Sequence, residues 1–507
     1  MRELASFLEG RWVEGTGEGR VVRDSRTSDA VARVRSEGLD VASAMAWTRR
    51  VGGAALRAAT FEERGEWLIA LGKCTHKNRD ELLQLSTHGG ATRSDGKFDV
   101  DGASGTLIYY GRLARSLGAR NLLMDGEQEP ILGSRRFVSQ HIRVPRQGLA
   151  LHVNAFNFPA WGMAEKLAVA ILAGVPVLTK PAPVNAIVAH RLVERWLEEG
   201  VLPEGALSLL HGEPADLLDH VQGQDCIAFT GSAATGRWFA SHPTVVATGA
   251  RVSVEADSVN AAVVGPDVQM GSETYDMLVN HIVREITQKA GQKCTAIRRV
   301  LVTPDLLDDL AERLVERLEL EPVGDPNEKT TRVGPLVDAA QRRHAEDGIA
   351  ALLEEAEVLW KGVAPDEGCF VAPHLLKSSE GARVVHGREV FAPVVSLVPY
   401  DGDSDTALEL VRAGEGGLLC VVYSDDAAWA GRVVLGASPW HGRVFWGSKK
   451  VADQAATPGM VLPDLVHGGP GRAGGGEELG GIRGLAFYMQ RTVIQADRGM
   501  LGKLLGG

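Results

Sequence analysis

The fold is decided by the stretch GLALHVNAFNFPAWGMAEKLAVAILAGVPVLTKP, residues 148–181. Its first part, residues 148–155, predicts a strand, and residues 161–174 carry apolar side chains at helical spacing and end at a glycine. Residues 175–181 predict a second strand, which a proline ends. A strand, a helix and a strand in succession indicate a βαβ unit of a parallel sheet.

The same alternation continues toward the C-terminus. Residues 185–200 predict a helix, and residues 225–240 predict a strand, a turn and a helix, which extends the unit to a Rossmann-like domain. A second α/β region follows, with elements expected at residues 274–291 (helix), 298–303 (strand), 305–320 (helix) and 387–400 (a loop entering a strand). Because 507 residues are too many for one ordinary core, we expect an α/β fold of at least two domains.

Composition excludes several classes of protein. The net charge of −11 argues against a general nucleic-acid binder, which needs a basic face. The five cysteines form no CxxC pair, so a disulfide framework or a zinc site is not expected and a reducing compartment is favoured. The start of the chain lacks the apolar region of a signal peptide, and no run of about 18 apolar residues predicts a membrane span. We expect a cytoplasmic protein.

One cysteine has an unusual setting. Cys294 lies in QKAGQKCTAIRRV, residues 288–300, among lysines, arginines and small residues. A lone cysteine is more often buried and inert than nucleophilic. Positive charge and room for a substrate are what a reactive thiolate needs, so the neighbours, Lys293 among them, favour a nucleophile with a lowered pKa.

Two further residues stand where catalytic groups are expected. Asn157 follows a predicted strand, where its amide could donate to a developing oxyanion, although turns commonly contain asparagine. Glu255 ends an apolar strand, where it is either a general base or an exposed strand end. His152, inside a predicted strand, is better explained as a core histidine than as a catalyst.

Other residues suit a dinucleotide. Lys180 ends a predicted strand and could meet a ribose or phosphate oxygen, or it is simply solvated. In FTGSAATG, residues 229–236, the backbone near Gly231 and the Ser232 hydroxyl suit a pyrophosphate, or Ser232 is a plain N-cap. In REVFAP, Glu389 could accept both hydroxyls of a ribose and Phe391 could pack beside a nicotinamide; alternatively they are a surface glutamate and a core phenylalanine.

The order of these motifs resembles the aldehyde dehydrogenase superfamily over nearly the whole chain. The motifs NAFNFP, WGMAEKLA, VEADSVN, AGQKCTAIRR and HGGPGRAGGGEELGGIRGLAFY are similar to one branch of it. That branch acts on ring-opened CoA-thioester semialdehydes. It includes the 3,4-dehydroadipyl-CoA semialdehyde dehydrogenases of aerobic benzoyl-CoA degradation and the dehydrogenase half of the phenylacetate ring-opening protein. Because the chain ends soon after this last motif, an added hydratase domain is not expected, which favours the benzoate-type enzyme.

The resemblance implies a mechanism and its residues. Cys294 is the expected nucleophile, Asn157 and the Cys294 backbone N–H the oxyanion donors, and Glu255 the base that activates water, with no metal required. The CoA thioester of the substrate is expected to remain intact. The residues expected to bind the cofactor are Phe156, Lys180, Pro183, Gly231, Ser232, Glu389 and Phe391. Pro183 replaces a glutamate common in NAD-preferring members, so NADP is the expected cofactor, with NAD possible.

Alternatives remain: a dehydrogenase for a simple aliphatic or aromatic aldehyde, or a non-catalytic scaffold that keeps the fold. We expect a dinucleotide-binding domain from residues 1–130 and 149–254, and a catalytic domain from residues 255–466. Residues 131–148 and 482–507 are expected to be oligomerisation strands of a homodimer or a dimer of dimers. The glycine-rich loop, residues 467–481, either lies close to the nicotinamide or the substrate tunnel, with Arg472 near a phosphate, or is mobile.

Overall fold

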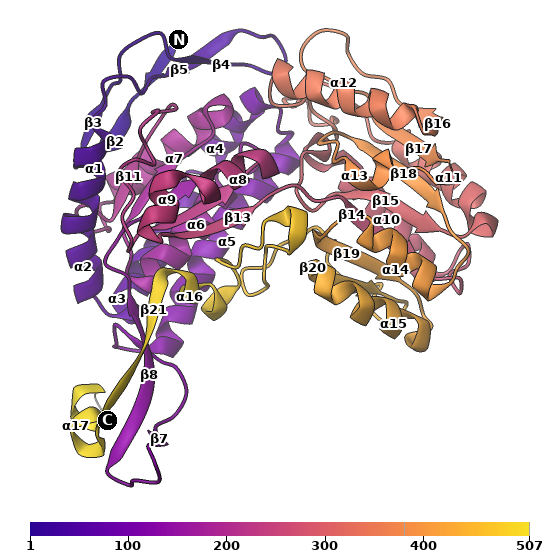
Figure 1. Ribbon diagram of the computed structural model, residues 1–507. Helices are drawn as coiled ribbons and strands as arrows, with labels where there is room; N and C mark the ends of the chain where they lie inside the picture. Colours follow the sequence, from indigo (N-terminus) through magenta and orange to yellow (C-terminus); the bar gives the residue numbers. More distant parts are fainter. Residues whose placement is uncertain (380, 506–507) are drawn as a thin grey trace.

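The computed structural model describes residues 1–379 and 381–505. It is an α/β protein with two seven-stranded sheets side by side and a long arm projecting from one of them, as Figure 1 shows. The expected fold class is confirmed. No helix of the described residues is long and apolar enough to cross a membrane.

The first sheet contains the predicted βαβ unit, β9–α6–β10, with α6 spanning Trp161–Ala173. Its first five strands are parallel, and the last two are antiparallel additions from the N-terminus. In spatial order the strands are β13 (Arg251–Glu255), β12 (Cys226–Thr230), β9 (Ala150–Val153), β10 (Val177–Lys180), β11 (Leu207–Leu209), β2 (Ser6–Leu8) and β3 (Arg11–Val13).

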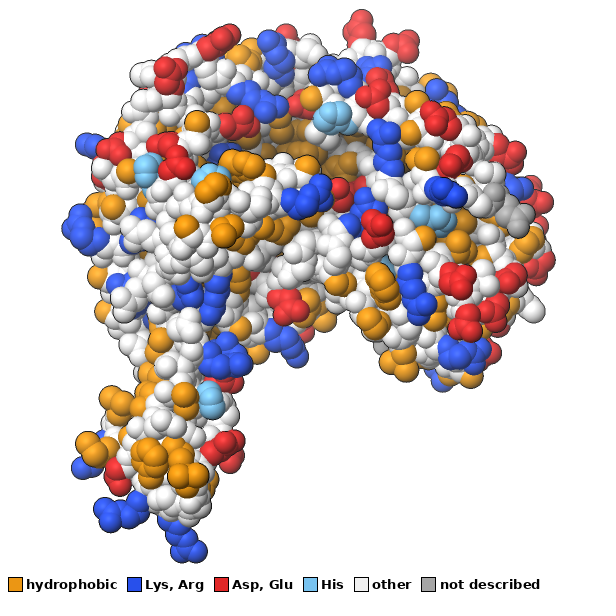
Figure 2. All heavy atoms as spheres, viewed as in Figure 1, with side chains coloured by type: hydrophobic (Ala, Val, Ile, Leu, Met, Phe, Trp, Pro, Cys, Tyr) orange, Lys and Arg blue, Asp and Glu red, His pale blue; other side chains and the backbone are white. Residues whose placement is uncertain are grey.

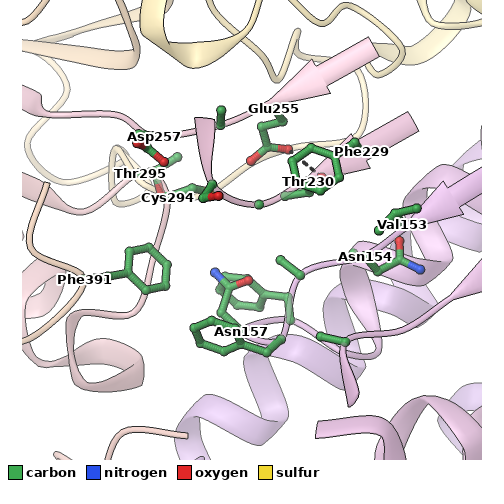
Figure 3. A pocket seen from close by; sticks show the side chains of 18 of the residues that line it. Val153, Asn154, Asn157, Phe229, Thr230, Glu255, Asp257, Cys294, Thr295 and Phe391 are labelled. Atoms are coloured by element: carbon green, nitrogen blue, oxygen red, sulfur yellow. Dashed lines mark hydrogen bonds between the residues drawn. The ribbon is translucent and has the colours of Figure 1, made fainter. Parts of the chain in front are cut away.

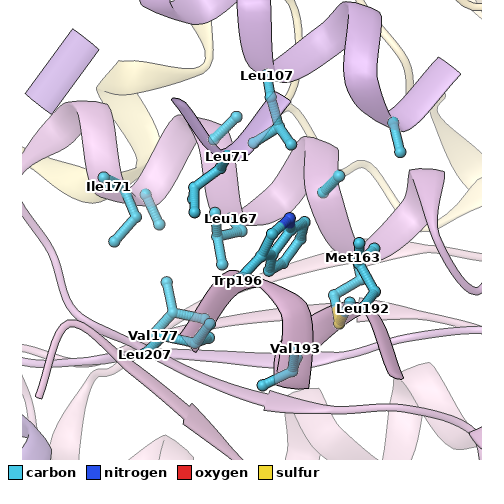
Figure 4. Packing of buried hydrophobic residues seen from close by; sticks show 14 of the residues in the cluster. Leu71, Leu107, Met163, Leu167, Ile171, Val177, Leu192, Val193, Trp196 and Leu207 are labelled. Atoms are coloured by element: carbon cyan, nitrogen blue, oxygen red, sulfur yellow. The ribbon is translucent and has the colours of Figure 1, made fainter. Parts of the chain in front are cut away.

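Helices α3 (Phe61–Lys77), α5 (Arg93–Leu117), α6 and α7 (Ala186–Glu199) pack into one apolar cluster beside this sheet. Trp196 of α7 lies at its centre, as Figure 4 shows, and its indole N–H donates to the Thr75 hydroxyl at 3.0 Å. Helix α6 is apolar on nearly every face because helices and sheet surround it. Only Glu165 and Lys166 interrupt that pattern.

The second sheet is parallel except for β16 at one edge. Its strands are β16 (Ala356–Lys361), β17 (His374–Ser378), β18 (Val394–Pro399), β15 (Ile297–Val302), β14 (Asn260–Val264), β19 (Gly417–Tyr423) and β20 (His441–Gly447). Helices α10 (Glu273–Thr287), α11 (Pro304–Leu318), α12 (Ala339–Leu353), α14 (Ser404–Arg412) and α15 (Ala427–Ala437) accompany it. The helix predicted over residues 274–291 is α10, which ends earlier than predicted, at Thr287.

The arm is built from the two stretches expected to be oligomerisation strands. β8 (Phe137–Pro145) and β21 (Met489–Asp497) pair antiparallel along nine positions, while β6 (Leu123–Met124) and β7 (Glu129–Pro130) also pair with β8. The two stretches thus pair with each other inside one chain. β21 has no strand on its other side in the described residues, and apolar side chains are exposed along the arm in Figure 2. The predicted domain bounds stay predictions.

Candidate active site

A cavity of about 630 Å³ lies at the carboxyl ends of β9, β10, β12 and β13, on the side that faces the second sheet. Figure 2 shows the molecule hollowed between its two halves. All ten residues predicted from sequence line this cavity: Asn157, Phe156, Lys180, Pro183, Gly231, Ser232, Glu255, Cys294, Glu389 and Phe391. Figure 3 shows Cys294, Glu255 and Asn157 facing the same space, with Phe391 to one side.

Cys294 is held by an unusual turn. Lys289, Ala290 and Gly291 all have left-handed backbones, with φ of 56°, 52° and 71°. The guanidinium of Arg298 donates to the carbonyls of Gly291 and Lys293 at 2.8 and 3.0 Å, which fixes the turn from inside. Cys294 is partly exposed, whereas the other four cysteines are buried. It is therefore the thiol that a substrate can reach.

The expectation that cationic neighbours lower the pKa of Cys294 is wrong. The Lys293 ammonium lies 2.8 Å from Glu285, away from the thiol, and Arg298 is engaged by carbonyl groups. Burial and the nearby Glu255 carboxylate instead raise the pKa of Cys294. Lys293 and Cys294 are neighbours in sequence, but their side chains point to different sides of the loop. Proximity in sequence therefore gave the wrong prediction for the pKa of Cys294.

Asn157 lies in the loop between β9 and α6. Its amide nitrogen donates to the carbonyl of Gln292 at 3.0 Å, which joins this loop to the nucleophile loop. The buried carboxylate of Asp99 accepts hydrogen bonds from the backbone of Ala160 and Trp161, at the start of α6. An amide has two N–H groups, so one remains for an oxyanion near Cys294.

Glu255 ends β13 and is buried, not an exposed strand end. Its Oε1 lies 3.0 Å from Nε2 of His467, and that nitrogen is 3.7 Å from the Cys294 sulfur. Burial raises the pKa of Glu255, but His467 and Lys166 outweigh burial and lower it to about 2. The Glu255 oxygen, the His467 nitrogen and the Cys294 sulfur all lie within 4.8 Å of one another.

Sequence reasoning did not single out His467, although it begins the glycine-rich loop. It also missed a buried group of charges beneath the cavity. Lys166 lies 3.2 Å from Glu478, which also accepts from Ser253. Burial raises the pKa of Glu165 to about 7, while the carboxylates overcome burial and raise the pKa of Lys166 to about 12. The sequence feature that could have revealed this group is the pair Glu165 and Lys166, two charged residues inside the otherwise apolar helix α6.

The cofactor candidates divide into two groups. Lys180 ends β10 with its side chain in the cavity, and burial lowers its pKa. Pro183 is buried at the start of the short helix Pro183–Asn185. Ser232 is the N-cap of α8 (Ala233–Ser241), accepting from the Thr235 N–H at 3.2 Å, so its helix N-terminus opens into the cavity.

Glu389 and Phe391 form the second group. Glu389 is neither a free nor an exposed carboxylate: it accepts from the Ser258 N–H at 3.2 Å and lies 3.6 Å from Arg298. Burial raises its pKa to about 7. The Phe391 ring lies 5.9 Å from the Phe156 ring and 5.5 Å from the Arg298 guanidinium. The Oε1 of Glu389 has no hydrogen-bond partner within the described chain, which suits a ribose hydroxyl.

The glycine-rich loop packs against β13 through backbone hydrogen bonds from Ala256 to Ala473 and from Gly476 to Val254. Gly474 approaches the Val254 carbonyl so closely that a Cβ would lie 2.5 Å from its oxygen. The loop thus brings His467 to the cavity, while Arg472 donates to the Gly387 carbonyl. His152 is fully buried and bonds the Tyr488 hydroxyl at 3.0 Å, as expected of a core histidine.

Comparison with known proteins agrees with this geometry. The aldehyde dehydrogenase family model matches residues 12–494. The 3,4-dehydroadipyl-CoA semialdehyde dehydrogenase of Aromatoleum evansii is 44% identical over 92% of this chain and 93% of its own, which confirms the branch that the motifs indicate.

Solved structures share the fold. A putative aldehyde dehydrogenase from Burkholderia cenocepacia has a TM-score of 0.84 at 24% identity, covering 97% of this chain and 99% of its own. A 3,6-anhydro-L-galactose dehydrogenase in complex with NAP has a TM-score of 0.85 at 19% identity, covering 98% and 100%. The chain belongs to the aldehyde dehydrogenase family and is an NAD(P)-dependent enzyme that oxidises aldehydes.

Proposed function

We propose that the chain oxidises a CoA-linked semialdehyde, 3,4-dehydroadipyl-CoA semialdehyde or a close relative, to the carboxylic acid with NADP. The observation that carries this proposal is the 44% identity to the Aromatoleum evansii enzyme over 92% of the chain. The cavity supports it, because a thiol, an amide and a carboxylate converge there.

In the first half of the reaction the Cys294 sulfur attacks the aldehyde carbon. The free N–H of the Asn157 amide and the Cys294 backbone N–H stabilise the oxyanion that forms. When bound, the nicotinamide would accept the hydride that leaves the former aldehyde carbon as the adduct on Cys294 becomes a thioester. Lys180, Pro183, Gly231 and Ser232 would contact the adenosine and phosphate portion; Glu389, Phe156 and Phe391 would hold the nicotinamide ribose and ring.

In the second half Glu255 activates a water molecule that hydrolyses the thioester on Cys294. Its carboxylate is ionised at neutral pH, since its pKa is about 2, so it is ready to orient and accept a proton from water. The CoA end of the substrate is not altered. Product formation should therefore need water and no added CoA-SH; a requirement for free CoA-SH contradicts the proposal.

The nucleophile is tested by Cys294→Ala. Turnover should be lost while cofactor binding survives, because none of the residues proposed to bind the cofactor is changed. Glu255→Gln is the matched comparison, since it should keep the first half-reaction. Dehydrogenase activity of Cys294→Ala within tenfold of wild type would defeat the assignment.

The preference for NADP is proposed from Pro183 and Lys180. A glutamate at position 183 would repel a 2′-phosphate, whereas proline carries no charge and the Lys180 ammonium lines the same cavity. A charge-assisted hydrogen bond from Lys180 favours the phosphate by roughly 1.5–3 kcal/mol, or about one to two decades in affinity. In Pro183→Glu the ratio of kcat/KM for NADP over NAD should fall. A wild-type preference for NAD, or an unchanged ratio in the variant, refutes this part.

A second candidate is an enzyme for simple apolar aldehydes, favoured by the rings of Phe98, Phe158 and Trp161 in the cavity wall. Measuring kcat/KM for a medium-chain aldehyde beside the CoA semialdehyde separates the two. One edge of β21 pairs with no strand of residues 1–379 and 381–505, which also supports a homodimer or a dimer of dimers. A monomeric mass at micromolar concentration would contradict that assembly.

A further inference from the structure

His467 contacts both reacting groups of the enzyme, yet the mechanism above gives it no role. Its Nε2 lies 3.0 Å from Glu255 Oε1 and 3.7 Å from the Cys294 sulfur, and the residue is only 5% exposed. Its other ring nitrogen, Nδ1, has no hydrogen-bond partner among the described residues. Within the described residues, the polar contacts of this ring are therefore with the nucleophile and the base.

The geometry fixes where the proton of His467 lies. A carboxylate oxygen only accepts, so the 3.0 Å contact requires a hydrogen on Nε2. Burial lowers the pKa of His467, but the charge and hydrogen bond of Glu255 outweigh burial and raise it. The pair therefore favours imidazolium and carboxylate. The other charged groups that act on this pair are Glu165, Lys166 and Arg443.

We propose that His467 is a further catalytic residue, which stabilises the Cys294 thiolate as its imidazolium partner. The S–H bond breaks, and its proton passes to a water molecule in the open cavity while Glu255 stays ionised. His467 keeps its Nε2–H, which lies within reach of both the Glu255 carboxylate and the Cys294 sulfur. Glu255 therefore remains available as the base for water in the second half-reaction.

In this role His467 provides the positive charge beside the Cys294 sulfur that Lys293 does not provide. The Lys293 ammonium is held by Glu285 at 2.8 Å, while His467 reaches the sulfur from a loop far along the chain. Without His467, the thiolate would form at a partly buried sulfur beside a carboxylate, where both burial and charge oppose it. The inference rests on the proposed function, because it takes Cys294 as the nucleophile.

The test measures alkylation of the full-length, cofactor-free chain by iodoacetamide across pH 6–10, with no aldehyde present. His467→Gln keeps an amide N–H that can bond Glu255 but loses the charge. His467→Phe loses both. Each should react about 10- to 100-fold more slowly than wild type at pH 7, with the inflection of the rate shifted to higher pH. His344→Gln is the control, because His344 lines the same cavity and its side chain makes no hydrogen bond or ion pair within the described residues.

A wild-type profile in His467→Gln would show that His467 only positions Glu255, and would overturn the proposal. Mass mapping must place the label on Cys294; labelling elsewhere means that the nucleophile itself is misassigned, a separate failure. If His467→Gln does not fold, His467→Ala is measured with and without added imidazole. Return of fast alkylation with imidazole supports the role, and no return overturns it.

Discussion

Gly291 should be the glycine of the nucleophile loop that tolerates no side chain. Its φ is +71°, and a Cβ there would lie 2.2 Å from the Ala392 carbonyl oxygen and 2.7 Å from the Pro393 nitrogen. Both are backbone atoms, so no side-chain rotation relieves the overlap. Arg298 also ties the two segments, donating to the carbonyls of Gly291 and Ala392 at 2.8 and 3.1 Å. An added methyl group must therefore push the nucleophile loop and the Glu389–Phe391 loop apart.

Two control glycines separate the destabilisation expected for Gly291→Ala into its two parts, the backbone conformation and the steric overlap. Gly249 has φ of +65° with nothing within 4 Å of an added Cβ, so Gly249→Ala measures the left-handed backbone alone, roughly 1–2 kcal/mol. Gly431 lies inside α15 in open space, where alanine should stabilise by about 0.5–1 kcal/mol. Gly291→Ala adds an overpacking cost of roughly 1–3 kcal/mol to the backbone cost, roughly 2–5 kcal/mol in all.

Two measurements test this prediction: thermal stability and enzymatic turnover. The order of melting temperatures should place Gly431→Ala at or above wild type, Gly249→Ala lower, and Gly291→Ala lowest. Because Cys294 is three residues away, a shift of about 1 Å should also reduce kcat about 100-fold in Gly291→Ala alone. If Gly291→Ala melts no lower than Gly249→Ala and keeps kcat within threefold of wild type, the close approach of the two backbones does not fix the nucleophile.

Three other variants test the site. Glu255→Gln should slow release of the acid while sparing acylation, giving a burst of reduced cofactor near one per active site; absence of both a burst and a trapped thioester argues against a deacylation role. Lys166→Met leaves Glu478 buried without its cation and should destabilise the fold by about 3–5 kcal/mol, measured as a lower melting temperature. The double variant Lys166→Met, Glu478→Gln should recover part of this stability, because it also removes the buried negative charge. The pKa of Glu389 is raised from 4.5 to about 7, so its folded form retains a proton through that interval and stability falls as pH rises across it. Glu389→Gln should flatten this fall by up to about 3 kcal/mol between pH 4.5 and 7 in unfolding experiments, and an unchanged slope would show that burial does not perturb this carboxyl.

The sequence by itself determined the main local elements and ten of the residues that line the cavity. The strand, helix and strand of residues 148–181 are β9, α6 and β10, because apolar periodicity and a terminal glycine act over short distances. Residues at strand ends, such as Asn157, Lys180 and Glu255, could be placed at the cavity because parallel strands present their carboxyl ends at one edge. The order of motifs along the chain then indicated the family.

Only the tertiary structure decided the electrostatics of the nucleophile. Lys293, adjacent to Cys294 in sequence, is turned toward Glu285, whereas His467 contacts Glu255 across 212 residues of chain. Sequence spacing carries no information about which side of an irregular loop a side chain takes, or which distant loop closes over it. The protonation of Cys294, Glu255 and His467 depends on burial and on charges a few ångströms away, and these exist only once the two sheets and the glycine-rich loop have packed together.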